Sequence, residues 1–120
     1  MVDEAMIAVI DDDESVRESL PDLLRQLGFS SQAFASAEAF LGSELLGQAR
    51  CLVLDVAMPG MSGIELQREL VSRGQLTPVI FITAQPADTL RPHLLAQGAV
   101  ACLSKPFSDT DLLAAIEAAL

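Results

Sequence analysis

The chain has 120 residues, of which 51% are hydrophobic and only 4% aromatic, and its formal net charge is −10. This length suits one compact domain, and the composition requires a core built from aliphatic side chains. An excess of negative charge disfavours non-specific binding to nucleic acid, whose phosphates attract cations. Against this acidic background, Lys105 is the single lysine of the chain.

No apolar run approaches the roughly 20 residues that a membrane-spanning helix needs. The acidic start, residues 1–4, lacks the basic region of a signal peptide. We therefore expect a cytoplasmic protein without membrane contact. Cys51 and Cys102 lie in apolar stretches outside any Cys-x-x-Cys motif, which favours buried, reduced thiols over a disulfide or a zinc site.

Short apolar runs alternate along the chain with longer segments of helical spacing. Four runs are continuously apolar, which is typical of strands buried on both faces of a parallel sheet. A fifth run, residues 29–34, is more polar and suits an edge strand. The four apolar runs cover residues 6–10, 51–54, 79–82 and 99–103.

Helices are predicted between these runs. Gly28 ends the first of them, residues 14–27, and the second covers residues 36–46, before Gly47. Ser62 to Glu65 form a capping box that opens a third helix, ending near residue 73. The last helix begins after Ser108 and is expected to bury four side chains, those of Leu112, Leu113, Ile116 and Leu120.

Three prolines disagree with this pattern. Pro21 falls inside the first helix and should kink it or mark a false start. In the fourth helix, Pro86 fits the first position but Pro92 is expected in the interior, so this helix should be short, bent or mobile. The alternation of strands and helices still predicts an α/β fold, a doubly wound parallel sheet with helices on both faces. Ligands of such sheets bind at the carboxyl ends of the strands.

Chemically complementary groups fall at four of these strand ends. The first strand is followed by Asp11, Asp12 and Asp13, the third by Asp55, the fourth by Thr83, and the fifth by Lys105. Clustered carboxylates require a cation or a shared proton, and ligands that are all oxygen favour Mg²⁺ over zinc. A carboxylate can attack phosphorus, and a lysine and a hydroxyl can then hold the phosphoryl oxygens.

Each of these residues also has a simpler interpretation when it is taken alone. The acidic run after the first strand could be a helix first turn favoured by the helix dipole. Asp55 could be a turn residue, Thr83 an ordinary strand end, and Lys105 a surface charge. Their coincidence at four strand ends favours a joint site. His93 is assigned to the surface or to packing, Asp13 to helix capping, and Met58 and Met61 to packing around the site.

Over its whole length the sequence resembles the receiver domains of two-component response regulators. The resemblance rests on Asp11-Asp12, on Val53-Leu54-Asp55 with Met58-Pro59-Gly60-Met61-Ser62-Gly63, on Phe81-Ile82-Thr83-Ala84, and on Lys105-Pro106-Phe107. Residues 9–17 look most like the subgroup that controls a helix-turn-helix transcription domain. The resemblance implies a flavodoxin-like strand order of 2-1-3-4-5 with five helices, and a cis bond before Pro106.

The resemblance also implies roles for the strand-end residues. Asp55 would accept a phosphoryl group from the phosphohistidine of a sensor histidine kinase. Mg²⁺ or Mn²⁺ would be held by Asp12, Asp55 and the backbone carbonyl of Ala57, with Asp11 acting mainly through water. Thr83 and Lys105 would contact the phosphoryl oxygens. Beyond its own phosphotransfer and autodephosphorylation, the domain would not be an enzyme.

Signalling in such receivers implies a change of the face made by the fourth helix, fifth strand and fifth helix. That change would control a phosphorylation-dependent homodimer or an output domain, and DNA would be reached only through an effector domain that this chain lacks. One position departs from the pattern, because Cys102 stands where receivers often carry the Tyr or Phe of their switch. The chain ends at Leu120 without a helix stop signal, which fits both a piece of a longer protein and a stand-alone receiver.

Two rival interpretations use the same residues. A haloacid-dehalogenase-type phosphatase would use Asp11 as its nucleophile, with Asp13, Thr83 and Lys105 in supporting roles. It would leave Asp55 without a role, and it needs a later acidic strand end that this sequence lacks. A dinucleotide-binding domain is disfavoured, because no Gly-x-Gly-x-x-Gly follows the first strand.

Overall fold

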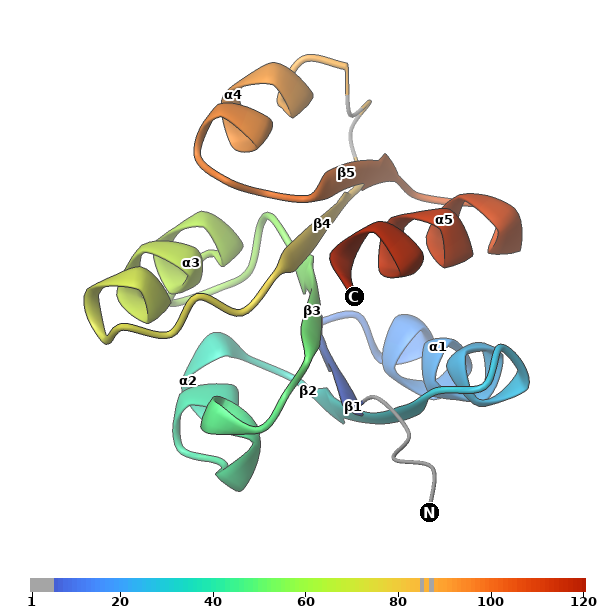
Figure 1. The fold of residues 1–120 in the computed structure, drawn as a ribbon, viewed down its shortest axis with the longest axis horizontal. Coiled ribbons are helices and arrows are strands. Elements are labelled where there is room, and N and C mark those ends of the chain that lie inside the picture. Colours follow the sequence, from blue (N-terminus) through green and yellow to red (C-terminus); the bar gives the residue numbers. More distant parts are fainter. Residues whose placement is uncertain (1–5, 85, 87) are drawn as a thin grey trace.

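A computed structural model of the chain describes residues 6–84, 86 and 88–120. The acidic start on which the signal-peptide argument rests, residues 1–4, lies outside the described residues. The fold is a five-stranded parallel sheet with helices on both faces, in the strand order β2-β1-β3-β4-β5 (Figure 1). The elements in chain order are β1 (Met6–Ile10), α1 (Glu14–Gln26), β2 (Ser30–Phe34), α2 (Ala37–Leu41), the 3₁₀ helix η1 (Glu44–Gly47), β3 (Cys51–Asp55), α3 (Gly63–Ser72), β4 (Val79–Thr83), α4 (Arg91–Ala96), β5 (Ala101–Ser104) and α5 (Asp109–Ala119). The predicted fold class and strand order are therefore confirmed.

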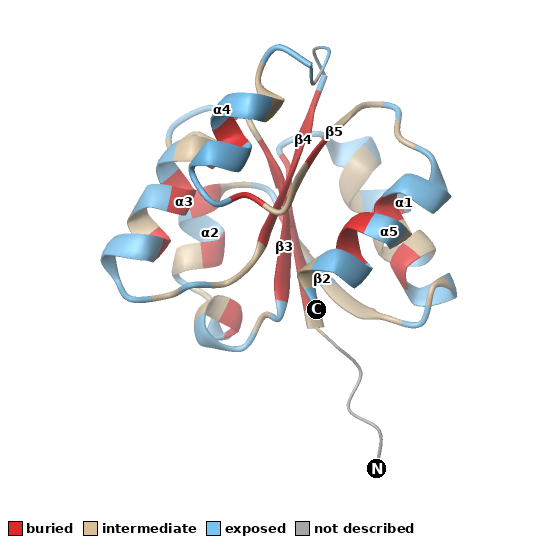
Figure 2. Ribbon diagram, turned by 45° about the horizontal axis from the view of Figure 1, so that its top comes forward, coloured by how far each residue is buried: buried red, intermediate tan, exposed pale blue. Residues whose placement is uncertain are grey.

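The sheet divides the core into two apolar layers. Helices α1 and α5 cover one face, and α2, α3 and α4 cover the other (Figure 2). Every residue of β3 and β4 is buried, which explains why these strands are continuously apolar in sequence. The polar strand β2 forms one edge of the sheet, as predicted.

Side-chain caps fix where most helices begin. Asp13 accepts a hydrogen bond from the backbone N–H of Ser15 at the start of α1, and Ser62 forms the predicted capping box with Glu65 at the start of α3. Ser108 caps α5 in the same way, by accepting from the N–H of Asp111. These caps satisfy backbone donors that have no partner within a helix, so the loops above the strand ends enter their helices at defined points.

The single helix predicted over residues 36–46 is wrong. Helix α2 ends at Leu41, and η1 follows after Ser43. The Ser43 hydroxyl donates to the carbonyl of Phe40 and accepts from the N–H of Leu45. Ser43 therefore closes the first segment and caps the second, a local competition that serine side chains commonly produce.

The proline predictions are corrected in part. Helix α1 continues unbroken through Pro21, so Pro21 does not mark a false start. Pro86 lies outside any helix, and Pro92 is the second residue of α4 instead of an interior one. At that position the missing N–H removes no hydrogen bond, because the first N–H groups of a helix have no partner within it. Helix α4 has six residues and is short, as expected.

Burial of the last helix also differs from expectation at one end. Leu112 and Ile116 are fully buried, but Leu113 is only half-buried, and Leu120 is 47% exposed beyond the end of α5. The helix contacts the sheet as far as Ile116 and Ala119, and the chain turns to solvent at Leu120. Within the described part of the chain, no helix combines the length and the apolar character needed to cross a membrane.

Candidate functional site at the carboxyl ends of the strands

The site forms where β1, β3, β4 and β5 end. Parallel pairing places Asp55 beside Ile82 and Thr83 beside Ser104, so the ends of the three strands lie at one level. Two backbone bonds tie the loops that follow: Val56 N–H donates to the carbonyl of Ile82 at 3.0 Å, and Lys105 N–H donates to the carbonyl of Thr83 at 2.7 Å. The sheet itself therefore brings the predicted residues together.

Asp11 is the most enclosed member of the site. Its side chain is fully buried, its backbone N–H donates to the carbonyl of Phe34, and its Oδ1 accepts from the N–H of Asp13 at 2.9 Å. The guanidinium of Arg17 donates a hydrogen bond to the backbone carbonyl of Asp11 at 3.0 Å. This contact was not predicted from the sequence. Asp12, the next residue, is exposed, so the two acids face different environments.

Lys105 supplies the positive charge of the site. Its Nζ lies 2.7 Å from Asp11 Oδ2 and 3.6 Å from Asp55 Oδ1. Burial lowers the pKa of Lys105, but the hydrogen bond with Asp11 and the surrounding carboxylates outweigh burial and leave the pKa above its usual value. The ammonium is therefore charged at neutral pH and lies between two carboxylates. The peptide bond from Lys105 to Pro106 is cis, as predicted.

The ionised form of Asp55 is disfavoured by its surroundings. Burial, the negative charge of Asp11 and the proximity of Asp12 together raise its pKa to about 7, although Lys105 acts in the opposite direction. This is the pattern of carboxylates that share a site without enough positive charge. A cation placed among them would remove the repulsion.

The donor set fits a hard divalent cation. Asp11, Asp12 and Asp55 each offer a carboxylate oxygen, and the three oxygens lie within 4.8 Å of one another. Apart from the ammonium of Lys105, no donor among the described residues reaches the buried Oδ2 of Asp11. Oxygen ligands at this spacing suit Mg²⁺ or Mn²⁺, which retain several waters and need only a few protein ligands.

The loop after β3 approaches the site closely and depends on a glycine. A Cβ on Gly63 would lie 2.1 Å from the carbonyl oxygen of Asp55, so no side chain fits at this position. Gly63 N–H also donates to the carbonyl of Val56 at 3.0 Å. The glycine lets the start of α3 pack directly under Asp55, a requirement that no local sequence pattern revealed.

A cavity of about 420 Å³ opens above these groups. Its walls bring together five of the predicted site residues, Asp12, Asp55, Ala57, Thr83 and Lys105. Thr83 is buried, with 5% of its surface exposed. The size and polar lining suit a phosphoryl group with water and a metal ion, and the cavity leaves Asp55 accessible from solvent.

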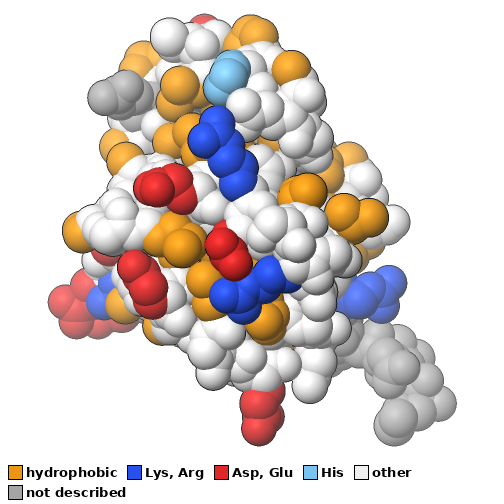
Figure 3. Space-filling view, turned by 90° about the vertical axis from the view of Figure 1, so that its left-hand side faces the viewer, with side chains coloured by type: hydrophobic (Ala, Val, Ile, Leu, Met, Phe, Trp, Pro, Cys, Tyr) orange, Lys and Arg blue, Asp and Glu red, His pale blue; other side chains and the backbone are white. Residues whose placement is uncertain are grey.

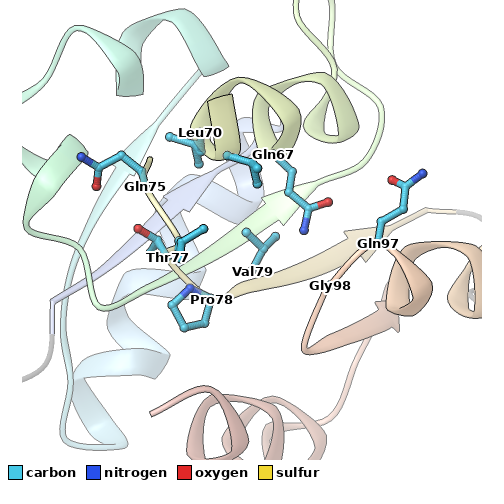
Figure 4. Close-up of a pocket in the computed structure, with 10 residues that line it drawn as sticks. Gln67, Leu70, Gln75, Thr77, Pro78, Val79, Gln97 and Gly98 are labelled. Carbon is cyan, nitrogen blue, oxygen red and sulfur yellow. The ribbon is translucent and has the colours of Figure 1, made fainter. Parts of the chain in front are cut away.

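A second cavity of about 250 Å³ lies at the opposite, amino edge of the sheet (Figure 4). Gln67 from α3 extends toward the space beside Val79, and Gln97, which follows α4, lines the cavity on the other side. None of the residues that line it carries an ionisable side chain. This cavity therefore lacks the charged groups that line the cavity at the carboxyl edge.

On the face formed by α2, α3 and α4, the described residues show no patch of a single charge sign. There, acidic and basic side chains are scattered among apolar and uncharged ones (Figure 3). A nucleic-acid interface would need basic side chains gathered along one surface. On this face the charge distribution agrees with the acidic composition in disfavouring direct binding to nucleic acid.

The two cysteines are buried and unpaired with each other, as predicted. Burial raises the pKa of the Cys51 thiol to about 12. Cys102 lies on β5, where its backbone carbonyl accepts two hydrogen bonds from the guanidinium of Arg91, at 3.1 and 3.3 Å. The position of the expected aromatic switch is therefore filled by a small buried thiol, and α4 is joined to β5 through Arg91.

The rival phosphatase assignment fails on geometry. It requires Asp11 as nucleophile, but Asp11 is fully buried and its Oδ2 is engaged by Lys105 at 2.7 Å. Asp55, which that assignment leaves without a role, lines the cavity together with Asp12 and Asp13, whereas Asp11 is not among the lining residues. The geometry therefore agrees with the receiver interpretation.

Comparison with known proteins gives the same family. The chain is 41% identical over 116 residues to the response regulator protein TodT of Pseudomonas putida, covering 97% of this chain and 51% of that protein. It is also 41% identical over 120 residues to the transcriptional regulatory protein FixJ of Azorhizobium caulinodans, covering 100% of this chain and 57% of FixJ. The chain thus spans about half the length of the curated relatives it matches.

Solved structures agree. The response regulator StyR superposes with a TM-score of 0.88 at 44% identity, over 98% of this chain and 60% of that one. The FixJ-N crystal structure superposes with a TM-score of 0.85 at 38% identity, over 98% of this chain and 94% of that one. The sequence model of the response regulator receiver domain matches residues 7–117, so the chain belongs to the receiver-domain family of two-component response regulators.

Proposed function

We propose that Asp55 accepts a phosphoryl group from the phosphohistidine of a sensor kinase. The observation that carries the proposal is the position of the Asp55 carboxylate, which lines the cavity with Thr83 and Lys105 and lies within 4.8 Å of two other carboxylate groups. A carboxylate oxygen of Asp55 would attack phosphorus while the bond from phosphorus to the imidazole nitrogen breaks. When the second ring nitrogen of the phosphohistidine carries a proton, the products are an acyl phosphate on Asp55 and a neutral imidazole on the kinase, whose freed nitrogen keeps the electron pair of the broken bond.

The surrounding residues have distinct tasks in this step. Lys105, already 3.6 Å from Asp55, would bind a phosphoryl oxygen, and the Thr83 hydroxyl would donate to another. Asp12, Asp55 and the Ala57 carbonyl would hold Mg²⁺, with Asp11 acting mainly through water. When bound, the ion neutralises the developing charge on the phosphoryl oxygens.

An apolar hollow beside the site supports docking of a protein donor. It measures about 540 Å³ and lies between α1 and the start of α5, bordered by Asp13 and Lys105 of the site. Val16, Leu20 and Phe107 supply apolar surface within it. A partner that covers this hollow would present its phosphohistidine at the mouth of the cavity.

Treatment with acetyl phosphate tests the proposal without the kinase. Intact-mass spectrometry should show one phosphoryl adduct with MgCl₂ and none with EDTA. Asp55→Asn should remove the adduct, and Asp22→Asn, the same change on the exposed face of α1, should keep it. Full labelling of Asp55→Asn, or labelling of the native chain in EDTA, would contradict the assignment.

We further propose that phosphorylation is transmitted by reordering α4, since Cys102 cannot make an aromatic flip. Helix α4 has six residues, no side-chain cap at its start, and Leu94 as its buried residue, features of a segment that opens at low cost. The reshaped surface of α4, β5 and α5 would favour a homodimer or control a transcriptional output domain. The named transcriptional role of relatives such as FixJ supports the second outcome.

Amide hydrogen exchange with beryllofluoride as the phosphate mimic tests this route. Protection across residues 86–97 should change when the mimic binds with Mg²⁺, together with protection around Asp55. Exchange that changes around Asp55 but stays constant across residues 86–97 would show that α4 is not the transmitting element.

A further inference from the structure

The loop between β3 and α3, residues 56–62, is held from outside by a side chain far away in sequence. Glu38, in the first turn of α2, accepts a hydrogen bond at its Oε2 from the backbone N–H of Met61, at 3.2 Å. The adjacent Gly60 fits closely under the same oxygen, since a Cβ there would lie 2.8 Å from Oε2. Gly60 also has a φ of +74°, which favours glycine.

This contact falls where the loop has few other anchors. Its beginning is tied to β4 through Val56 N–H, and its end is tied by Gly63 N–H and the Ser62 cap. Among the hydrogen bonds of the described residues, the one from Met61 to Glu38 is the only one that joins residues 57–61 to another element. Met58 adds apolar burial, with 8% of its surface exposed.

The free stretch of the loop contains Ala57, which lines the cavity. Ala57 has no side chain that could fix its own orientation, so its carbonyl points wherever the loop directs it. A hydrogen bond that holds the loop at Met61 restricts this orientation before any ion binds. Partners that orient a ligand in this way commonly change metal affinity although they do not touch the metal.

We propose that Glu38 is a positioning residue for the cation site, setting its affinity for Mg²⁺ by holding the β3–α3 loop. This inference rests on the proposed function and deepens it, because it assumes that the Ala57 carbonyl is a ligand. The hydrogen bond from Met61 to Glu38 also links α2 to the site, so ion binding at Asp55 changes the environment of the Met61 amide.

Titration with MgCl₂ measures the effect directly. Binding is monitored by ¹H–¹⁵N NMR, because the chain has no tryptophan whose fluorescence could report it. Glu38→Ala should weaken Mg²⁺ binding about tenfold, the lower end of the range for residues that orient a metal ligand. Glu38→Gln keeps an acceptor oxygen and should restore most of the affinity. Glu44→Ala, which removes an exposed carboxylate of η1, should bind as the native chain does.

Further measurements separate positioning from folding. The free energy of unfolding of metal-free Glu38→Ala, measured in urea by far-UV circular dichroism, should differ little from that of the native chain. The Mg²⁺ affinity of the same variant should be clearly weakened. The Met61 amide of the native chain should shift on titration, and this response should be lost in Glu38→Ala.

Native affinity in Glu38→Ala would overturn the inference. Equal weakening in Glu38→Ala, Glu38→Gln and Glu44→Ala would also overturn it, because charge and not the hydrogen bond would then be responsible. Either result in a chain whose Asp55 is still labelled with Mg²⁺ leaves the proposed function intact. A native chain that binds no Mg²⁺ and is not labelled would instead refute the proposed function.

Discussion

The two edges of the sheet are built from the same strands but differ in chemistry. At the carboxyl edge, three carboxylates gather within 4.8 Å of one another, and the single lysine pairs with two of them, Asp11 and Asp55. At the amino edge, a cavity of about 250 Å³ is lined by apolar side chains and uncharged amides (Figure 4). Every strand runs from one edge to the other, so the geometry of the strands alone does not account for the difference in chemistry.

The difference between the two edges shows where ionised side chains lower the stability of the fold. At the carboxyl edge, burial and the neighbouring carboxylates raise the pKa of Asp55 to about 7, which means that its ionised form costs free energy in the fold. No comparable cost arises at the amino edge, where no lining residue is charged. Substitutions at the two edges should therefore act differently on stability and on the response to Mg²⁺.

Replacing Lys105 should have the largest effect. Lys105→Ala leaves the buried Asp11 without its ammonium, and we expect a loss of about 3 kcal/mol in metal-free unfolding free energy, near the low end for a broken buried pair because Lys105 is partly exposed. Urea denaturation with EDTA, followed by far-UV circular dichroism, measures it. MgCl₂ should recover part of the loss.

Arg73→Ala provides the matched control, because it removes a cation that is paired with Glu69 on the surface. Such pairs contribute little, so this variant should unfold within about 1 kcal/mol of the native chain. If Lys105→Ala proved as stable as Arg73→Ala in EDTA, the carboxyl edge would not depend on its lysine.

Replacing Asp55 should have a smaller effect of opposite sign. Asp55→Asn removes one of three crowded carboxylates, and we expect a gain of about 1 kcal/mol in metal-free unfolding free energy, as for other strained functional charges. The same variant should lose most of the stabilisation that MgCl₂ gives the native chain. Both quantities come from urea titrations at neutral pH, and a metal-free loss of stability would argue against charge crowding.

Replacing Gln67 at the amino edge should have the smallest effect. Gln67 is 7% exposed, and its side chain makes no hydrogen bond among those of the described residues. Gln67→Leu should therefore change the free energy of unfolding by less than about 1 kcal/mol, because removing the Gln67 amide leaves no hydrogen-bond partner unsatisfied. Its Mg²⁺ response and Asp55 labelling should match the native chain. A changed Mg²⁺ response would show that the two edges are coupled.

Sequence reasoning located the carboxyl edge because its signals are local and repeated. Each predicted site residue follows a strand, and parallel pairing brings such ends together. The caps Asp13, Ser62 and Ser108 were likewise predicted or consistent with local rules. The α/β class and the strand-end groups could be found in this way from local patterns, whereas the strand order and the role of each group came from the resemblance to receiver domains.

The parts that sequence reasoning missed depend on contacts between distant segments. Glu38 meets the loop at Met61, 23 residues away, and nothing near Glu38 indicates it. Gly63 was placed in a capping box, but its need to lack a side chain arises from the carbonyl of Asp55. The errors at Ser43 and Pro92 are of another kind, where a helix boundary shifted by a few residues.

The contact between Arg91 and Cys102 has a consequence for the protein in concentrated solution. Strand β5 forms one edge of the sheet, and an open edge can pair with a strand of another molecule. The guanidinium of Arg91 occupies the Cys102 carbonyl with two N–H groups and carries a positive charge to that edge. A strand of another molecule would have to displace both hydrogen bonds before it could pair with β5. Arg91 should therefore oppose edge-to-edge aggregation of the domain.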